Sequence, residues 1–240
     1  MHMNGVRADW RLIHAAAMDR CQFDRRRLQN RLDSLKEPAR LYSKRAFDIT
    51  LALLLLAVLS PLLLALAYLI GRDGGDVLFG HSRIGAQGRP FKCWKFRSMV
   101  PDAESALRQV LDADPAARAE WERDFKLRND PRITPIGRFL RSTSLDELPQ
   151  LINVLTGEMS LVGPRPIVAA EVARYGAAFH DYARCRPGIT GIWQVSGRND
   201  TGYGQRVRLD QHYARNWSFG ADLIVLIRTP VAVLRRSGAY

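Results

Sequence analysis

Two adjacent carboxylates, Asp146 and Glu147, lie in an arginine-rich part of the chain. Arg138 and Arg141 precede them, and Arg165 follows between two prolines. A carboxylate can attack a phosphorus atom or hold a metal ion such as Mg²⁺, while guanidinium groups bind phosphoryl oxygens. Acids set among bases are therefore typical of a site that handles phosphate.

The acid pair, Asp146 and Glu147, also has a purely structural interpretation. Ser144 followed three residues later by Glu147 is the pattern of a capping box, and acids stabilise the start of a helix. The predicted helix runs from Ser144 to about Leu155 and is stopped by Gly157. A helix start also attracts phosphate, so the same segment could cap its own backbone and aim Asp146 at a diphosphate.

The chain has 240 residues, and 36 Lys and Arg against 24 Asp and Glu give it a formal net charge of +12. Such an excess favours an anionic partner: nucleic acid, anionic lipid or a phosphorylated substrate. Three widely spaced cysteines predict a reducing, cytosolic compartment and no cysteine metal site. The sequence contains no HExxH, Walker loop or GxGxxG, so zinc catalysis, P-loop hydrolysis and a dinucleotide cofactor lose support.

Residues 49–70 form an apolar run of 22 residues without a charge. A straight helix of this length is roughly 33 Å long, enough to cross the hydrocarbon core of a bilayer. Ser60 and Pro61 stand at its middle, where proline bends a helix and serine can bond back to a carbonyl. Basic residues flank both ends, so the positive-inside rule gives no direction. These arguments leave a re-entrant helix, a spanning helix and a buried core helix open.

The rest of the chain predicts a β-hairpin and several helices. Residues 77–79 and 91–96 flank a turn at 85–88, and Lys95 and Arg97 point the same way along the second strand. Residues 193–195 look like a short strand. Helices are predicted over residues 102–125 with an interruption at Pro115, 171–182, 205–215 and 221–236. The last helix could lie on a membrane surface or dock on the core. The predicted fold class is mixed α/β and mostly helical.

Several segments, in order, resemble the bacterial sugar transferases, which are monotopic polyprenyl-phosphate phosphoglycosyl transferases. The resemblance begins at residues 44–48 and continues to Tyr240. The segments that carry it are residues 60–61, 95–99, 144–150, 161–166, 186–191 and 194–198. Agreement over so many segments in the same order is not expected by chance.

The resemblance implies that the chain moves a sugar-1-phosphate from a UDP-sugar to undecaprenyl phosphate and releases UMP, with Mg²⁺ as cofactor. Asp146 matches the family's nucleophile, which forms a covalent phosphosugar intermediate. Glu147 matches its partner in the catalytic dyad, and both are the expected metal ligands. The residues expected to bind substrate phosphate are Lys95, Arg97, Arg141, Arg165 and, as the weakest match, Arg198.

The resemblance also implies an architecture. Residues 1–43 are a basic N-terminal arm outside the resemblance. Residues 44–72 are a re-entrant membrane helix, a helix-break-helix kinked at Ser60 and Pro61 with both ends in the cytoplasm. Residues 73–240 are a small cytosolic catalytic domain with a short β-hairpin and amphipathic membrane-surface helices. The expected location is the cytoplasmic face of the bacterial inner membrane, in contact with its lipids.

Within the family, residues 74–81, 196–200 and 233–240 resemble the undecaprenyl-phosphate galactose phosphotransferases of exopolysaccharide synthesis, so galactose is favoured over glucose. Two other classes of function compete. A basic, membrane-tethered nucleic-acid binder would interleave aromatic residues with its basic clusters, and this chain does not, so nucleic acid is not expected as a partner. A non-catalytic adaptor has no need of an intact acid pair. Self-association into a homo-oligomer is left open.

Overall fold

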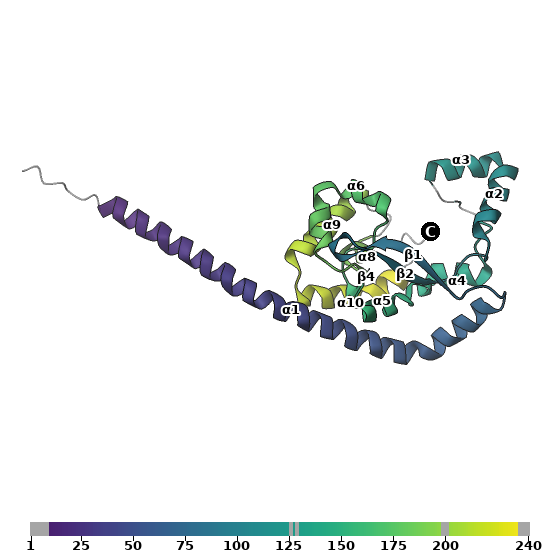
Figure 1. Cartoon of the computed structure of the whole chain (residues 1–240), viewed down its shortest axis with the longest axis horizontal. Coiled ribbons are helices and arrows are strands. Elements are labelled where there is room, and N and C mark those ends of the chain that lie inside the picture. The colour runs from purple at the N-terminus through teal and green to yellow at the C-terminus, as the bar shows by residue number, and fades with distance from the viewer. Residues whose placement is uncertain (1–9, 125–126, 128–129, 198–201, 235–240) are drawn as a thin grey trace, which may run out of the picture. The chain divides into compact units, whose positions relative to one another are not determined.

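The structure of the chain is a computed structural model, shown in Figure 1. It describes residues 10–124, 127, 130–197 and 202–234, with the backbone alone for residues 10–39. Contacts within the chain define two compact units, residues 1–47 and residues 48–240. The second unit, called the catalytic unit below, contains every candidate site residue that the structure describes.

The apolar run forms the C-terminal part of one helix, α1 (Trp10–Gly71). The predicted division into two helices is wrong, because α1 continues through Pro61, although its apolar part bends (Figure 1). Pro61 has no N–H for the carbonyl of Ala57, one helical turn earlier. Ser60 Oγ donates to that carbonyl oxygen at 2.8 Å, as the sequence predicted. The serine therefore supplies the donor that the proline lacks, and the helix bends without ending.

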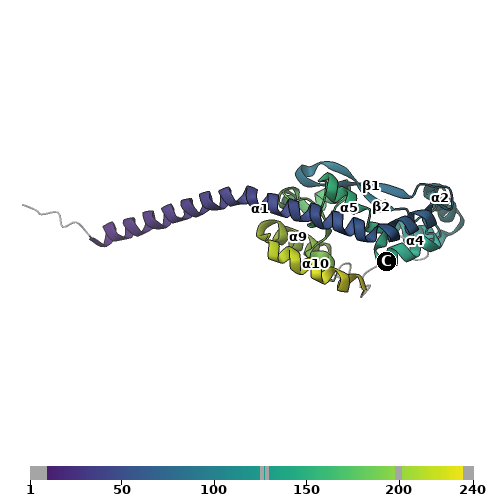
Figure 2. The same cartoon turned by 90° about the horizontal axis from the view of Figure 1, so that it is seen from below.

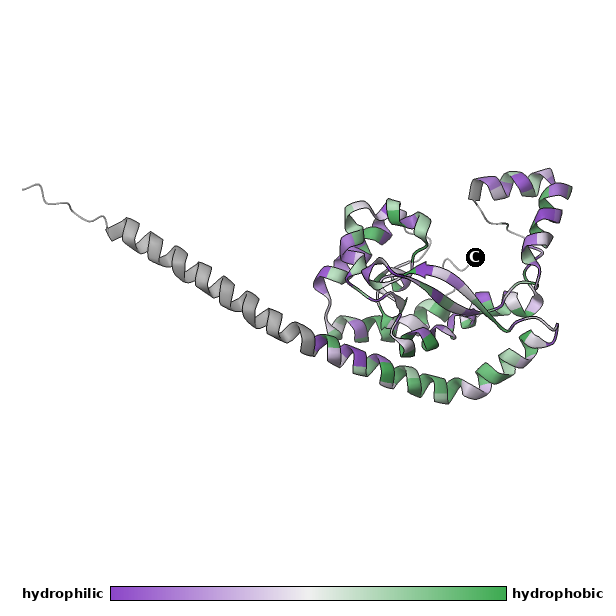
Figure 3. Cartoon of the chain, in the orientation of Figure 1, coloured by the Kyte–Doolittle hydropathy of each residue, from purple (hydrophilic) through white to green (hydrophobic). Residues whose placement is uncertain are grey.

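Within the described residues, Arg40–Gly71 is the only helical segment long and apolar enough to cross a membrane. Only 11% of its most apolar window is buried, so it is not the core helix of a globular domain. Figure 3 shows this segment as a largely apolar stretch. Its exposed large side chains include Leu53, Leu54, Val58, Leu62, Leu64 and Tyr68.

Both ends of the apolar segment are attached to the rest of the catalytic unit. Near its start, the buried carboxylate of Asp48 accepts hydrogen bonds from Ser160 Oγ at 2.8 Å and Leu161 N at 3.2 Å. At its end, Leu66 and Ile70 pack against Phe96 and Leu140 in a buried apolar cluster. Leu145 and Leu148, the residues on either side of the acid pair, pack against the same cluster. The acid pair is therefore next to the place where the apolar helix is buried.

The predicted hairpin is confirmed. Strands β1 (Leu78–Ile84) and β2 (Pro90–Phe96) pair antiparallel, with Phe79 opposite Lys95. The turn between them contains the short 3₁₀ helix η1 (Ala86–Gly88), in which Gln87 and Gly88 have positive φ. Figure 2 shows the hairpin and the C-terminal helix α10 (Phe219–Leu234) on opposite sides of the catalytic unit.

The central helices depart from the prediction at the acid pair. Helices α2 (Ala103–Ala113) and α3 (Pro115–Asp124) confirm the interruption at Pro115. The single helix predicted from Ser144 is instead three elements: α4 (Pro135–Thr143), the 3₁₀ turn η2 (Leu145–Glu147) and α5 (Gln150–Thr156). Ser144 ends α4 in the left-handed region at φ 56°, and its side chain makes no capping bond. The capping-box prediction is therefore wrong, because the residue is already the C-cap of the preceding helix.

The C-terminal half builds a second, two-stranded parallel sheet from β3 (Ser160–Val162) and β4 (Gly188–Thr190). The helix predicted over 171–182 is wrong as one element, because Gly176 at φ 51° and ψ −131° breaks it. Residues 193–195, predicted as strand, belong to the helical turn α8 (Ile192–Val195). The pieces of the broken helix are η3 (Ala169–Glu171), α6 (Val172–Tyr175), η4 (Gly176–Ala178) and α7 (Phe179–Ala183).

The last two helices, α9 (Tyr203–Asn216) and α10, confirm the predicted helical segments. One face of α10 docks on the core, where Asp222 and Val225 are buried. Asp222 accepts hydrogen bonds from Tyr213 Oη at 2.9 Å and Trp217 Nε1 at 2.9 Å. The other face is apolar and exposed, with Phe219, Leu223, Ile224, Ile227, Val231 and Leu234. The mixed α/β, mostly helical fold class is confirmed.

Candidate active site

The acid pair lies on the 3₁₀ turn η2, between α4 and α5. The left-handed residue Ser144 turns the chain sharply after α4, so Asp146 points inward and only 9% of the residue is exposed. Glu147 is half-buried beside it. Leu145 and Leu148 anchor the turn in the apolar cluster, which leaves the two acids between them. This turn presents two carboxylates from consecutive residues without placing either in a regular helix.

Lys95 on β2 joins the two acids. Its Nζ lies 2.7 Å from Glu147 Oε1 and 3.3 Å from Asp146 Oδ2. The strand is fixed at this point by Asn153 of α5, which is fully buried. Its side chain accepts from Trp94 N at 3.0 Å and donates to Lys92 O at 2.7 Å. Asn153 therefore holds the backbone of β2 on both sides of Cys93, just before Lys95.

The electrostatics of the pair follow from burial and from Lys95. Burial raises the pKa of Asp146 above its usual value, the charge of Lys95 opposes this, and Glu147 raises the pKa further. Burial disfavours the charged form of Lys95, but the carboxylates of Glu147 and Asp146 outweigh it and raise the pKa of Lys95. The lysine therefore stays cationic and keeps the two buried acids from repelling one another.

Arg141, on α4, belongs to the same site. Burial lowers its pKa from the ordinary arginine value, and the charges of Asp146 and Asp130 oppose that change. Its Nε donates to Ser98 Oγ at 2.8 Å. Asp130 is itself held by Arg132, with Nη2 to Oδ2 at 2.6 Å. Arg141 thus carries positive charge beside the nucleophile candidate while Ser98 fixes its direction.

Arg165 is positioned by a close approach of two backbones. A Cβ added to Gly163 would stand 2.4 Å from Arg186 O, and one added to Gly188 would stand 2.1 Å from Gly163 N. Only glycine allows β3 and β4 to pack this closely just before the Arg165 turn. The Arg165 guanidinium lies over the Trp193 ring at 5.4 Å from its centroid, and its charge lowers the pKa of Lys95. The structure therefore brings Lys95 into contact with both acids, while the charge of Arg141 acts on Asp146 and that of Arg165 acts on Lys95.

Arg97 is not brought to the acid pair. Its guanidinium binds Asp73, with Nη1 to Oδ2 at 2.8 Å, and donates to the carbonyl of Ile70 at 2.9 Å. It also donates to the carbonyls of Asp76 and Met99. Strand β2 ends at Phe96, so the alternation that would align Arg97 with Lys95 stops one residue too early. A hollow of about 420 Å³ beside Arg97 is likewise at the end of α1, lined in part by Leu69, Ile70 and Pro135.

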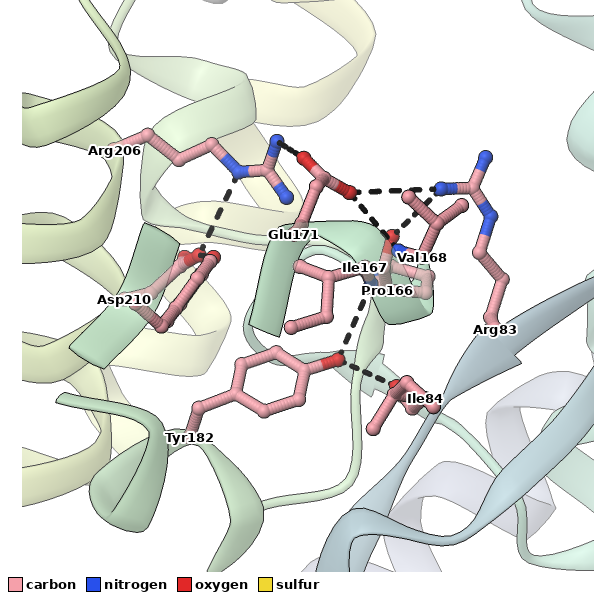
Figure 4. Close-up of polar contacts among 10 residues, drawn as sticks. Arg83, Ile84, Pro166, Ile167, Val168, Glu171, Tyr182, Arg206 and Asp210 are labelled. Atoms are coloured by element: carbon pink, nitrogen blue, oxygen red, sulfur yellow. Dashed lines mark hydrogen bonds and ion pairs between the residues drawn. The ribbon is translucent and has the colours of Figure 1, made fainter. Parts of the chain in front are cut away.

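Arg198, the fifth predicted phosphate-binding residue, lies outside the described residues. The sequence did not single out Asn153, nor three charged residues that meet near Arg165: Arg83, Glu171 and Arg206 (Figure 4). A lone asparagine on a leucine-rich helix was a signal for the first. Arg206 lies in a helix with several other arginines, so its type and spacing carry no signal.

The acid pair has the type and number of ligand groups that Mg²⁺ needs from a protein. No group of three or more His, Cys, Asp or Glu side chains is gathered in the part of the chain that the structure describes. Mg²⁺ is commonly bound by one or two carboxylates together with substrate phosphates. Asp146 and Glu147 supply that number, and a bound diphosphate would supply the rest.

Comparison with known proteins agrees with the geometry. Residues 39–236 match the family model described as bacterial sugar transferase. An undecaprenyl-phosphate galactose phosphotransferase of Salmonella typhimurium is 53% identical over 214 residues, which are 89% of this chain and 44% of that protein. The exopolysaccharide production protein ExoY of Sinorhizobium fredii is 49% identical over 199 residues, 82% of this chain and 88% of that protein.

A UDP-glucose:undecaprenyl-phosphate glucose-1-phosphate transferase of Escherichia coli is 40% identical over 206 residues, 82% of this chain and 41% of that protein. The chain thus spans less than half the length of the Salmonella and Escherichia proteins, and most of the Sinorhizobium one. All of the predicted and described site residues lie within the matched range. The chain therefore belongs to the bacterial sugar transferase family.

Proposed function

We propose that the chain transfers a sugar-1-phosphate from a UDP-sugar to undecaprenyl phosphate and releases UMP. The observation that carries this proposal is the contact of Lys95 with both Asp146 and Glu147, with Arg141 and Arg165 close by. A buried carboxylate surrounded by three cations can approach an anionic diphosphate, because the cations offset the repulsion between the two anions. The names of the similar proteins support the same substrates.

In the first step, an oxygen of Asp146 attacks the phosphorus atom that bears the sugar. The bond between that phosphorus and the oxygen bridging the two phosphates breaks, and the bridging oxygen leaves with UMP. The product is a phosphosugar ester on Asp146, so no proton has to move. Arg141 and Arg165 stabilise the charge that develops on the phosphoryl oxygens.

In the second step, a phosphate oxygen of undecaprenyl phosphate attacks the same phosphorus atom and displaces the Asp146 carboxylate. The diphosphate-linked lipid leaves, and Asp146 is free for another donor. Asp146 and Glu147 are the residues that would hold Mg²⁺, which supplies positive charge to the phosphates when it is bound. Lys95 orients the two carboxylates before the first step, and it stabilises the Asp146 carboxylate when the second step releases it.

The apolar part of α1 is the proposed membrane segment, re-entrant from the cytoplasmic face of the bacterial inner membrane. Its support is the bend, the basic residues on both flanks and the attachment of both ends to one unit. The exposed apolar face of α10 would lie on the lipid surface. The donor sugar is proposed to be galactose, with glucose as the alternative, because similar proteins carry both names.

The proposal is tested with the purified full-length chain. Incubation with a UDP-sugar but without lipid should add the mass of a phosphohexose to the peptide that contains Asp146. Asp146→Asn should abolish both the adduct and UMP release, while Asp112→Asn, which changes an exposed carboxylate that is paired with Arg118, serves as the control. An Asn variant with full UMP release would exclude Asp146 as the nucleophile.

Donor identity is tested by UMP release across UDP-galactose, UDP-glucose and their N-acetylated forms with undecaprenyl phosphate. A preference for UDP-galactose supports the proposed sugar. A preference for UDP-glucose or an N-acetylated donor would overturn that assignment and leave the reaction itself intact.

A further inference from the structure

The strongest unused feature of the catalytic unit is the guanidinium of Arg206, on α9. The residue is only 7% exposed, yet its Nε and Nη2 have no hydrogen-bond partner among the described residues. Its Nη1 donates to Glu171 Oε1 at 3.1 Å, and the carboxylate of Asp210 lies 3.9 Å from Nε, too far for a hydrogen bond. Leaving donors of a buried charge unpaired is costly, so they are expected to have a ligand.

Two further arginines meet Arg206 at this place. Glu171 joins it to Arg83 of β1, whose Nη1 lies 3.9 Å from Glu171 Oε2 (Figure 4). Arg206 and Arg165 both lie over the ring of Trp193, at 5.2 and 5.4 Å from its centroid. We call Arg83, Arg165 and Arg206 the arginine cluster. Glu171 bridges two of its members and also accepts from Val168 N at 2.9 Å.

The arginine cluster is continuous with the acid pair through Arg165. The charge of Arg165 acts on Lys95 on one side and on Arg83 on the other, lowering the pKa of each. The backbone N–H of Arg165 bonds to the Asp210 carboxylate, and Tyr175 Oη donates to Asp210 Oδ2 at 2.7 Å. Arg165 therefore stands between two groups of charged residues: the carboxylates of the acid pair with Lys95, and the guanidinium groups of Arg83 and Arg206.

The surroundings of the cluster favour a nucleotide over a lipid phosphate. The rings of Trp193 and Tyr203 flank Arg206, whose guanidinium carbon lies 5.3 Å from the centroid of Tyr203. Gln194 Oε1 is also buried without a hydrogen-bond partner among the described residues, and the Tyr203 hydroxyl lies within reach of Glu171. Aromatic rings, hydroxyl and amide groups beside guanidinium groups suit a ribonucleoside phosphate, whereas a polyprenyl chain needs an apolar path.

We propose that Arg206 and Arg83, together with Arg165, bind the nucleoside-bearing phosphate of the donor, the phosphate that leaves as the nucleoside monophosphate. This assignment rests on the proposed function, because it places the second phosphate of a diphosphate next to the one attacked by Asp146. The unpaired Nε and Nη2 of Arg206 donate two parallel hydrogen bonds to the phosphate oxygens. Glu171 holds Arg83 and Arg206 apart and oriented while the site is empty.

The test measures binding of UMP and, separately, of undecaprenyl phosphate in nanodiscs to the full-length chain. Arg206→Gln should weaken UMP binding by at least about tenfold, since charge-assisted hydrogen bonds are lost, and leave lipid-phosphate binding within about twofold. Arg208→Gln is the matched control, because this arginine is on the same helix but exposed. It should bind UMP like the wild type.

Two more variants cover the case in which Arg206→Gln does not fold. Arg206→Lys keeps the positive charge beside Glu171 but lacks the two adjacent N–H donors of the guanidinium group. It should therefore also weaken UMP binding. Arg83→Gln should weaken it too, whereas Arg89→Gln, an exposed arginine at the start of β2, should not. UMP binding that is unchanged in every folded cluster variant would overturn the assignment, and so would a loss confined to lipid phosphate.

The wild-type transfer assay separates this inference from the proposed function. If the wild type releases UMP from a UDP-sugar but the cluster variants bind UMP normally, only the cluster assignment fails. If the wild type neither releases UMP from any UDP-sugar nor binds UMP, both the proposed function and the cluster assignment fail.

Discussion

Lys95 and Arg97 are two residues apart, yet their charged ends bind at two different places. Lys95 contacts the acid pair, with Nζ 2.7 Å from Glu147 Oε1, and Arg97 binds Asp73 and the carbonyl of Ile70 near the end of α1. The end of β2 therefore connects the candidate nucleophile to the end of the apolar helix through a single rigid strand. A displacement of the helix end would be passed on to Lys95.

Replacing Lys95 should change the pH dependence of the first step. The charge of Lys95 lowers the pKa of Asp146 against the opposing effect of burial. Lys95→Met removes that charge, so the pKa of Asp146 rises and the acid side of the pH–rate profile moves to higher pH. The rate at its maximum should also fall by roughly a hundredfold or more. Adduct formation on Asp146, followed from pH 5 to 9, measures both.

Lys95→Arg is the control for that prediction, because it keeps a positive charge at the same place. Its profile should stay near that of the wild type on the acid side. An acid limb at the same pH in Lys95→Met and the wild type would show that Lys95 does not set the ionisation of Asp146.

Asp210 should make the protein less stable as the pH rises. Burial raises the pKa of Asp210 to about 6 from 3.8, so the folded state holds a proton between these values that the unfolded state has lost. Stability contributed by this group is therefore present at low pH and lost as the pH rises to about 6. The difference is on the order of 3 kcal/mol. Melting temperatures of the wild type and Asp210→Asn should thus diverge as the pH rises from about 4 to about 6, with the Asn variant gaining relative to the wild type.

Arg208→Gln, which changes an exposed residue on the same helix, is the control for the Asp210 experiment. Its melting temperature should follow that of the wild type across the range. A constant gap between Asp210→Asn and the wild type at all pH values would contradict the raised pKa.

Replacing Arg97 should slow turnover without weakening nucleotide binding. Arg97→Gln loses the paired contact with Asp73, which holds the pKa of that carboxyl at about 2, and the bond to the carbonyl of Ile70 near the end of α1. Lys95 would then shift relative to Asp146, and an error of about 1 Å in such a position costs roughly a hundredfold in rate. The kcat should fall while the Kd for UMP stays unchanged.

Arg108→Gln provides the comparison for Arg97, since it removes the same charge from an exposed helix surface. It should retain wild-type kcat. A parallel loss of UMP affinity in Arg97→Gln would instead place Arg97 in the phosphate site, as the sequence predicted.

Gly137→Ala should destabilise the catalytic unit. A Cβ at this position would stand 1.9 Å from the backbone oxygen of Ser98, so α4 must move away from the segment that follows β2. Overpacking of this kind costs about 1–3 kcal/mol. Because α4 also carries Arg141, whose Nε bonds to Ser98 Oγ, turnover should fall as well. Chemical unfolding measures the first effect, and UMP release measures the second.

Gly204→Ala tests whether the effect at Gly137 is one of space. A Cβ at Gly204 would meet only the end of the Arg208 side chain, at 3.7 Å, and the residue lies within α9. Alanine there should stabilise the helix by about 0.5–1 kcal/mol. Equal stability losses in the two variants would contradict the packing argument.

The topology of the apolar segment is tested with native cysteines. Cys21 precedes the segment and Cys185 follows it, so a re-entrant helix puts both on the cytoplasmic side. A membrane-impermeant maleimide should label both in inverted vesicles and neither in right-side-out vesicles. Cys93 is buried, and burial raises the pKa of its thiol to about 11, so it should label slowly. The variants Cys21→Ser and Cys185→Ser assign the signals.

Labelling of Cys21 and Cys185 from opposite sides would show that the segment crosses the membrane. The proposed re-entrant topology would then be excluded, while the chemistry proposed for the acid pair would be unaffected. Labelling of both cysteines in right-side-out as well as in inverted vesicles would indicate leaky membranes, and detergent-lysed vesicles give that reference.

The sequence predicted the features that depend on local pattern. Alternation and a glycine-containing turn predicted the hairpin, Pro115 predicted the interruption between α2 and α3, and Ser60 predicted its own bond to a carbonyl. The types of Asp146 and Glu147 predicted where the candidate site is. Each of these features depends on residues close together in the chain, so the local sequence is enough to predict it.

Features that depend on distant contacts were missed or misplaced. Ser144 fits a capping box locally, but it is already the C-cap of α4. The sequence pattern does not show whether such a serine ends one helix or begins the next. The alternation along the strand predicted that the side chains of Lys95 and Arg97 point the same way. Instead, Arg97 forms an ion pair with Asp73 just beyond the end of α1. Arg83, Glu171 and Arg206 come from three elements that only the folded chain brings together.

The two attachments of the apolar helix have a mechanical consequence. Asp48 fixes one end to the strand that leads into the Arg165 turn, and Arg97 fixes the other end to the strand that carries Lys95. Both anchors belong to one folded unit, which therefore sets the distance between the two ends of the helix. The helix between Asp48 and Ile70 is roughly 33 Å along its contour and bends between these anchors. Straightening the helix would require one anchor to be released. The bend at Ser60 and Pro61 therefore lies between two anchors in the same folded unit, so a membrane that flattened the helix would have to work against both.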